Sequence, residues 1–148
     1  MSTVSQFLDE KGRNVFSVRQ DAPVFEALEL MAEKDCGALV VLDDLDHLAG
    51  VISERDYARK IILQRKASAD TPVSEIMTAN VVTVGEQHTL DECLRVMGQQ
   101  NIRHLPVVHG RKVVGVLGIG ELVTHKMQAK EDEIQNLTTY INGNFAYR

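Results

Sequence analysis

The chain repeats itself once, and this duplication constrains its fold more than any other feature of the sequence. A solenoid needs at least three units to bury a continuous core, so two copies are expected to pack on each other. We therefore expect two halves with pseudo-twofold symmetry that share one core, with ligand space at their interface. Similar residues coincide at an offset of about 66: Ser17 and Val18 with Thr83 and Val84, Val24 with Leu90, Leu28 with Leu94, and Met31 with Met97.

Within each copy, the apolar pattern predicts the order strand, helix, strand, strand, helix (β-α-β-β-α) of an α/β (α+β) protein. The first helix of one copy has Pro23 at its first helical position, and that of the other has capping-box spacing between Thr89 and Glu92. The expected opening strands are 15–18 and 81–84, the hairpins are 38–42 with 48–52 and 105–108 with 113–117, and the second helices are 54–64 and 119–127.

The last part of the chain predicts one further helix. Ile134, Leu137 and Ile141 follow helical spacing within residues 131–141, and Asn142 with Gly143 would end the helix there. We expect its apolar side to cover the core of the same chain, with a dimer partner as the alternative. The expected organisation is a first motif at 1–64, a linker at 65–77, a second motif at 78–127, and a C-terminal helix and tail at 128–148.

Composition excludes several classes of protein. Of the 148 residues, 44% are hydrophobic and 25% are charged, which is typical of a globular chain. The N-terminus lacks an apolar signal segment, and no apolar run approaches the roughly 18 residues of a membrane span, so we expect a cytoplasmic protein. Cys36 and Cys93 are isolated, and the acidic residues Asp43, Asp44 and Asp46 lack the Gly and Glu of a calcium loop, so no metal site is expected.

The net charge of −5 argues against binding of RNA or DNA, because affinity for polynucleotides depends on a basic face. The local exception is a basic cluster in the first copy. It is interpreted either as a solvated helix face and linker or, in part, as a phosphate-facing group. Its members are Arg55, Arg59, Lys60, Arg65 and Lys66.

The most informative local motif runs from Gly50 to Asp56, where a strand is expected to end and a helix to begin. In a purely structural interpretation, Ser53 is the N-cap and Asp56 its capping partner three residues later, which stabilises the helix by roughly 1 kcal/mol. In a functional interpretation, the same helix start binds a phosphate and Asp56 accepts hydrogen bonds from the two hydroxyls of a ribose.

The duplication, the order of elements and the Gly50–Asp56 motif together resemble the cystathionine β-synthase (CBS) domain family. The resemblance extends roughly from Val15 to Val123, and two CBS motifs in tandem resemble a Bateman module, a regulatory unit that binds adenosine nucleotides between its motifs. Met77 and Thr78 before the second copy, and residues 102–107 within it, are also similar to family signatures.

The resemblance implies one good nucleotide site per chain. It places Asp56 on the ribose, Ser53 near the phosphate and Val51 beside the base, with Arg55 as a further candidate. The second copy would complete the pocket with Thr78, Thr83, Arg103 and His104, of which Arg103 suits a phosphate because its guanidinium is a fixed fork of donors. A surface ion pair for Arg103 and an ordinary half-buried position for His104 remain open.

A second, weaker or empty site is expected where the other copy departs from the motif. Gly118 replaces the hydroxyl residue and Glu121 replaces the aspartate. Gly118 would still let backbone N–H groups approach a phosphate, and Glu121 is long enough to reach a ribose. The remaining candidates are Ser17, Gly37, Ala38 and Val116.

No catalytic set is evident, so we expect a regulatory protein and not an enzyme. The leading hypothesis is a stand-alone adenosine-nucleotide sensor without a required cofactor. Its ligand would be AMP or a related compound (ATP, ADP, NAD(H) or S-adenosylmethionine), and it would act through a homodimer and an effector protein. The alternative is a dimerising scaffold with degenerate pockets.

Overall fold

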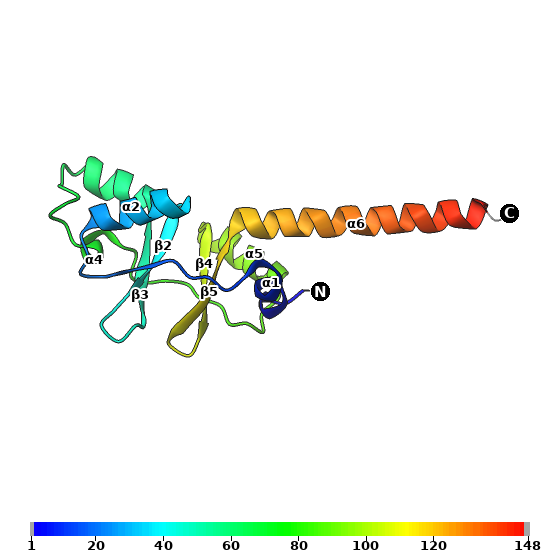
Figure 1. Ribbon diagram of the computed structural model, residues 1–148, viewed down its shortest axis with the longest axis horizontal. Coiled ribbons are helices and arrows are strands. Elements are labelled where there is room, and N and C mark those ends of the chain that lie inside the picture. The colour runs from blue at the N-terminus through cyan, green and yellow to red at the C-terminus, as the bar shows by residue number, and fades with distance from the viewer. Residues whose placement is uncertain (1, 147–148) are drawn as a thin grey trace.

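The computed structural model describes residues 2–146, and its first half follows the predicted order of elements (Figure 1). Strand β1 (Ser17–Arg19) precedes helix α2 (Val24–Lys34), and strands β2 (Ala38–Leu42) and β3 (Leu48–Ser53) form the hairpin. The strand order is β1-β2-β3, with β1 parallel and β3 antiparallel to β2. The helix predicted at 54–64 consists of α3 (Glu54–Tyr57) and a π-helical segment, η1 (Ala58–Ile62).

The second half repeats this arrangement with a reduced sheet. Helix α5 (Leu90–Gln100) is followed by the antiparallel pair β4 (His104–His109) and β5 (Lys112–Gly118). The prediction of an opening strand at 81–84 was wrong in extent, because this segment forms only an isolated parallel bridge between Val84 and Val107. The bridge is the counterpart of the β1–β2 pairing in the first half.

The first helices of the two halves end alike and begin differently. The predicted capping box of α5 is confirmed, since the Thr89 hydroxyl accepts from the N–H of Glu92 and the Glu92 carboxylate accepts from the N–H of Thr89. Pro23 is the N-cap of α2 and not its first helical residue. Both helices end at a left-handed residue, Asp35 at φ 52° and Asn101 at φ 54°, which turns the chain into the next strand.

Each half exchanges the segment that precedes it with the other half. Helix α1 (Val4–Lys11) precedes the first copy but packs on the second, and helix α4 (Val73–Ile76) precedes the second copy but packs on the first. The backbone bonds are reciprocal: Val4 N–H to His88 C=O and Leu90 N–H to Ser2 C=O in one half, Val73 N–H to Ala22 C=O and Val24 N–H to Thr71 C=O in the other. This repeated pattern shows the pseudo-twofold symmetry directly.

The core consists of two clusters, so the expectation of a single shared core was wrong. Each cluster contains the apolar side of its own half together with the exchanged segment of the other half. Val4, Phe7 and Leu8 of α1 lie with Leu90, Met97 and Leu122, whereas Val73 and Ile76 of α4 lie with Val24, Met31 and Ile52. Two small cores tied by exchange replace one large core.

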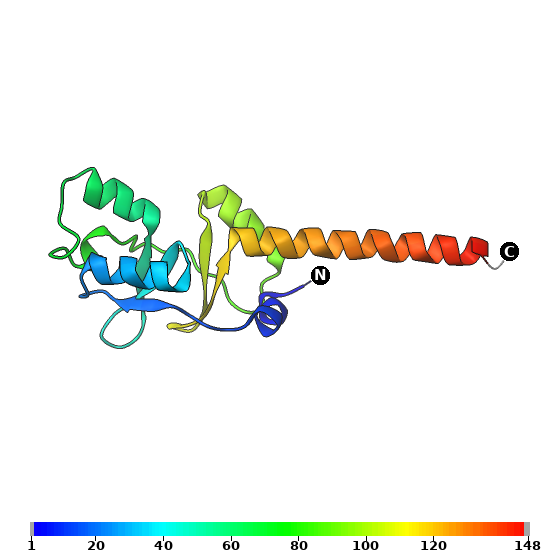
Figure 2. The same ribbon diagram turned by 45° about the horizontal axis from the view of Figure 1, so that its top comes forward.

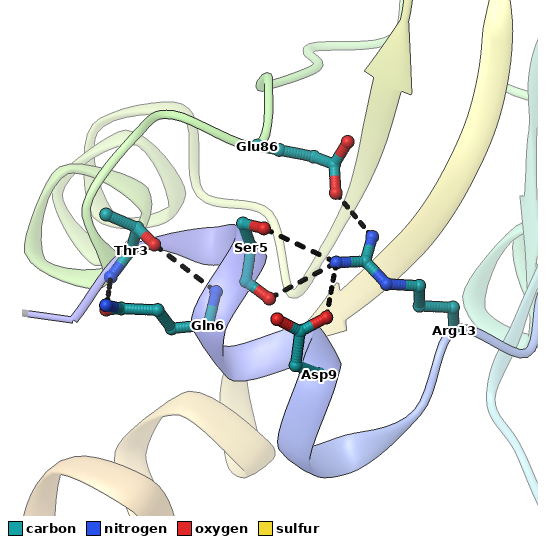
Figure 3. A network of polar contacts seen from close by, with 6 residues as sticks. All are labelled: Thr3, Ser5, Gln6, Asp9, Arg13 and Glu86. Atoms are coloured by element: carbon teal, nitrogen blue, oxygen red, sulfur yellow. Dashed lines mark hydrogen bonds and ion pairs between the residues drawn. The ribbon is translucent and has the colours of Figure 1, made fainter.

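Polar contacts fix α1 to the loop before α5 (Figure 3). The Arg13 guanidinium donates to Asp9 Oδ1 at 2.8 Å and to the Ser5 carbonyl at 3.3 Å, and it also pairs with the Glu86 carboxylate. Thr3 and Gln6 form a capping box at the start of α1. These bonds position the C-terminal end of α1, and with it Lys11, beside the second half.

The end of the chain forms one continuous helix, α6 (Ile119–Ala146), which extends away from the body (Figures 1 and 2). The prediction of two helices separated after residue 127 was wrong, because Gln128, Ala129 and Lys130 are good helix formers. Its expected apolar side does not cover this chain's own core: Ile134, Leu137 and Ile141 are 62%, 57% and 49% exposed. Among residues 2–146, no helix is long and apolar enough to cross a membrane.

Two glycines allow the close approach of the exchanged segments. A Cβ on Gly50 would lie 2.6 Å from the backbone oxygen of Thr78, and one on Gly115 would lie 2.8 Å from Leu8 Cδ1. The two positions correspond in the duplication, and both face the segment contributed by the other half.

We predict that Gly50→Ala lowers the free energy of unfolding by about 1–3 kcal/mol, since the Thr78 backbone cannot yield without shifting α4 and β3. Gly98→Ala is the matched control: it lies within α5, where a Cβ meets nothing within 4 Å. It should raise stability by about 0.5–1 kcal/mol, because Gly weakens a helix interior. Urea denaturation followed by circular dichroism measures both, and equal effects would contradict the close-approach argument.

Candidate functional site

The first cleft lies between the two halves, at the end of β3 and the start of α3. Its volume is about 380 Å³, which is within the range of small-molecule sites. Both halves contribute side chains to it. Seven of the eight residues predicted for the main site line this cleft: Val51, Ser53, Arg55, Asp56, Thr78, Arg103 and His104.

Ser53 and Asp56 form the predicted capping pair at the start of α3. Asp56 Oδ2 accepts from the backbone N–H and from the hydroxyl of Ser53, both at 3.0 Å, and Ser53 Oγ accepts from the N–H of Asp56 at 3.2 Å. The other oxygen, Oδ1, lies 3.3 Å from Lys60 Nζ. The structural interpretation is therefore correct, yet it leaves lone pairs of the carboxylate for a ligand, because a carboxylate can accept about four hydrogen bonds.

The wall opposite α3 is held by an exchange of two backbone bonds. Val51 N–H donates to Thr78 C=O at 3.0 Å, and Thr78 N–H donates to Val51 C=O at 2.9 Å. Lys60 adds a bond from its ammonium to the carbonyl of Ile76 at 2.9 Å. These bonds hold Val51 and Thr78 together, so this wall of the first cleft is rigid and includes residues from both copies.

The charged residues in the first cleft are mixed, with two arginines, Arg55 and Arg103, near the carboxylates of Glu54 and Asp56. His104 lies in the cleft and is half-buried. Burial lowers the pKa of His104 below its ordinary 6.5, the Glu121 carboxylate opposes this shift, and Arg103 adds to it. His104 is therefore neutral at pH 7 and presents one donor and one acceptor.

A second cleft of about 670 Å³ lies at the equivalent position of the other copy. Five of its six predicted residues line it: Gly37, Ala38, Val116, Gly118 and Glu121. In place of the Ser–Asp pair, Glu121 Oε1 accepts from the N–H of Gly118 at 3.2 Å. Lys11 of α1 reaches into this cleft, where its ammonium bonds the Glu121 carboxylate at 3.0 Å and the carbonyl of Val116.

Two predicted residues lie elsewhere. Thr83 is not among the residues that line the first cleft, and Ser17 lines a separate groove beside Glu26, Glu29 and Glu33 of α2. Several lining residues were missed by sequence reasoning. Asn80 and Val82 of the first cleft correspond to Asn14 and Phe16 of the second at the repeat offset of 66, which is the signal that would have identified them.

Lys34 and Lys11 make the second cleft richer in lysine than the first. The Lys34 ammonium lies 5.5 Å from the centre of the Phe16 ring, within range of a cation–π contact.

The cysteines do not offer activated thiolates. Burial raises the pKa of Cys93 to about 11, and burial also raises the pKa of Cys36, so both thiols are protonated at neutral pH.

The acidic residues of the β2–β3 turn have a structural role. Asp43 accepts hydrogen bonds from the N–H groups of Leu45 and His47 and so shapes this turn. Within residues 2–146, no three His, Cys, Asp or Glu side chains lie close enough together to hold a metal ion.

The duplicated cleft agrees with comparison to known families. The family model described as CBS domain matches residues 9–63 and again residues 73–127. The chain belongs to the CBS-domain family. CBS pairs are generally regulatory modules that bind adenosine-type ligands, and proteins that consist of CBS domains are generally not catalytic.

Relatives share both sequence and fold. The mitochondrial CBS domain-containing protein CBSX3 of Arabidopsis thaliana is 33% identical over 152 residues, covering 97% of this chain and 74% of that protein. The solved structure of a protein with CBS domains from Burkholderia ambifaria MC40-6 is 44% identical with a TM-score of 0.81, covering 86% of this chain and 95% of that one. Further Arabidopsis relatives are longer, and this chain spans about a fifth of their length.

A more distant solved structure shares the fold at 24% identity. The CBS domain pair of protein MJ0100 has a TM-score of 0.76 and covers 88% of this chain and 98% of its own. That pair was solved in complex with 5′-methylthioadenosine and S-adenosyl-L-methionine.

The shifted pKa of His104 predicts a pH dependence of stability. Because its folded pKa lies below the unfolded value, the unfolded chain binds the proton first as the pH falls. The contribution of neutral His104 to the free energy of unfolding is therefore fully present above about pH 6.5, and it is lost as the pH falls through the pKa of His104 in the folded protein. Urea denaturation at several pH values should show this loss, and His104→Gln should remove it. His109→Gln, on the exposed end of the same strand, controls for the loss of a histidine.

Proposed function

We propose that this protein is a regulatory sensor that binds one adenosine nucleotide, with AMP as the first candidate, in the first cleft. ATP, ADP, NAD(H) and S-adenosylmethionine belong to the same chemical class. The protein would signal as a homodimer through an effector protein, and a cytoplasmic location is part of the proposal. The complex of the MJ0100 pair supports the adenosine class without selecting one member of it.

The observation that carries the proposal is the placement of Asp56. Its side chain is 13% exposed, and it lines the cleft at the start of α3. A carboxylate in this position can accept hydrogen bonds from both hydroxyls of a ribose. Capping a helix alone does not require the carboxylate to face a cleft. Ser53 would then lie near the phosphate, and Val51 with its Thr78 partner would lie beside the base.

The two arginines support an anionic group at the outer side of the cleft. Arg55 lies in the first turn of α3 and Arg103 precedes β4, so they come from different copies. A phosphate held between them would link the two halves by charge-assisted hydrogen bonds. Binding would therefore favour one relative orientation of the halves, which is how a module without a catalytic site transmits a signal.

The alternative, a dimerising scaffold with degenerate pockets, is favoured by exposed apolar side chains on the first half. Phe25 of α2 is 51% exposed, and Ile62 and Leu63 at the end of η1 are 57% and 75% exposed. Such residues are typical of a protein-binding surface when they form a patch. The ligand experiment below separates the two functions.

Asp56→Ala should reduce the affinity for AMP at least about 100-fold, because it removes a charged acceptor with two ribose bonds. Isothermal titration measures the affinity. Glu92→Ala is the matched control, since it also deletes the carboxylate of a capping box but on α5, away from the cleft. Both variants should lose about 1 kcal/mol of stability, and only Asp56→Ala should lose AMP.

The outcomes are distinct. If the wild type binds none of AMP, ATP, NADH or S-adenosylmethionine, the sensor proposal is overturned in favour of the scaffold. If Glu92→Ala weakens AMP binding as much as Asp56→Ala does, the effect comes from stability and Asp56 has no ligand role.

The second cleft should open when Lys11 is removed. Uncharged adenosine is the appropriate probe. It has no phosphate that could pair with the Lys11 ammonium, so its affinity does not include that attraction. In an Asp56→Ala background, adding Lys11→Met should raise the affinity of the remaining cleft for adenosine about 10-fold, because Glu121 no longer has a competing partner. Lys112→Met, at the exposed end of β5, is the control. Unchanged titration curves would show that Lys11 does not obstruct this cleft.

A further inference from the structure

From its second turn onward, helix α6 carries an apolar stripe that this chain leaves uncovered. The stripe consists of Val123, Met127, Ile134, Leu137 and Ile141, and these residues are between 42% and 62% exposed. The start of the helix is anchored: Leu122 is buried, His125 meets the Phe7 ring edge to face, and Lys126 pairs with Asp91. Figure 2 shows the rest of the helix standing clear of the body.

The spacing of the stripe is that of a coiled coil. Steps of 4, 7, 3 and 4 residues from Val123 to Ile141 place Met127, Ile134 and Ile141 at position a of successive heptads, and Val123 and Leu137 at position d. Ile at a with Leu at d favours two parallel strands. The partner that fits such a stripe is another helix of the same pattern.

The charges beside the stripe select a parallel, in-register copy of the same chain. Lys126 is at position g and Glu131 is at the following position e, five residues later. In a parallel pair, position g of one helix meets this e of the other, so the Lys126 ammonium, which pairs with Asp91 of its own chain, would also lie beside Glu131 of the second copy. In an antiparallel pair, g meets g and e meets e, and Lys126 loses Glu131 as a partner.

Lys130 interrupts the stripe at position d. In register, Lys130 faces the same lysine of the second copy, which costs stability, although both flexible stems can carry their ammonium groups to solvent. A slip of one heptad would set Lys130 against Val123 or Leu137 and leave two apolar core positions without an apolar partner. A membrane surface is a poor occupant by comparison. The charged side chains between residues 121 and 133 include Lys126 and Lys130 against Glu121, Glu131, Asp132 and Glu133, whereas interfacial helices have a basic polar side.

We propose that the α6 stripe is covered by α6 of a second copy of this chain in a parallel two-stranded coiled coil. The proposal deepens the homodimer of the proposed function and rests on that part of it, not on the identity of the ligand. Helix α6 begins at Ile119, directly after Gly118 and within the second cleft. The coil would thus couple the second clefts of two chains.

Leu137→Glu and Asn136→Glu test the surface, because they add the same charge to adjacent residues of an exposed helix, of which Leu137 is at position d of the stripe and Asn136 is at position c, outside it. Light scattering on the full chain should show a dimer for the wild type and for Asn136→Glu. Leu137→Glu should raise the dissociation constant of the dimer at least about 100-fold, since two leucines are lost per interface. Circular dichroism confirms that each variant is folded.

Cysteine cross-linking tests the parallel register independently. Under mild oxidation, Leu137→Cys should form a disulfide-linked dimer at least about 10-fold faster than Asn136→Cys, because only position d faces its own copy. The unmodified chain, with Cys36 and Cys93, gives the background. Equal rates at the two positions would overturn the proposed coil.

The failures can be told apart. If Leu137→Glu remains a dimer, the coil is wrong and the proposed homodimer stands on another surface. If the wild type is a monomer, both are wrong. Neither result bears on nucleotide binding, which the Asp56→Ala titration decides.

Discussion

The reciprocal exchange of leading segments is the interaction on which the rest of the structure depends. Backbone bonds join Val4 to His88 and Val73 to Ala22 at equivalent places in the two halves. Burial of the apolar side chains of α1 and α4 contributes about 1.5–3 kcal/mol for each large residue, because each leaves water for a nearly complete core. Without these segments each half would expose one side of its core. The relative position of the halves, and so the shape of both clefts, follows from the exchange.

The clefts show how one residue can serve stability and recognition together. Asp56 caps α3 through Ser53 and also faces the space between the halves. Its counterpart Glu121 performs the same capping through Gly118 but is bonded by Lys11. Duplication thus produced two clefts with the same backbone arrangement, and the charged side chains that line them have diverged. The family assignment explains the shared arrangement, while the local contacts distinguish the two clefts.

Much of this could be predicted from the sequence, and the failures share a physical cause. The helices α2 and α5, both hairpins and the capping pair depend on residues close in sequence, so their patterns are visible locally. Helix α1 was missed because Val4, Phe7 and Leu8 find their partners more than 75 residues away, near Val84 and Leu90. The residues of the first cleft that belong to the Gly50–Asp56 motif could be predicted from the sequence. The Lys11–Glu121 contact could not, since the two residues are 110 positions apart.

The exchange also determines when the molecule can become complete during synthesis. The first core needs Val73 and Ile76, so it can close once synthesis has passed Ile76. Helix α1 must wait longer, because its core includes Leu117 and Leu122. Throughout that interval Val4, Phe7 and Leu8 lack their native cover on a chain still attached to the ribosome. Helix α1, which is made before both copies, is therefore among the last elements to find its place, and its apolar residues are the ones most in need of protection from misassembly.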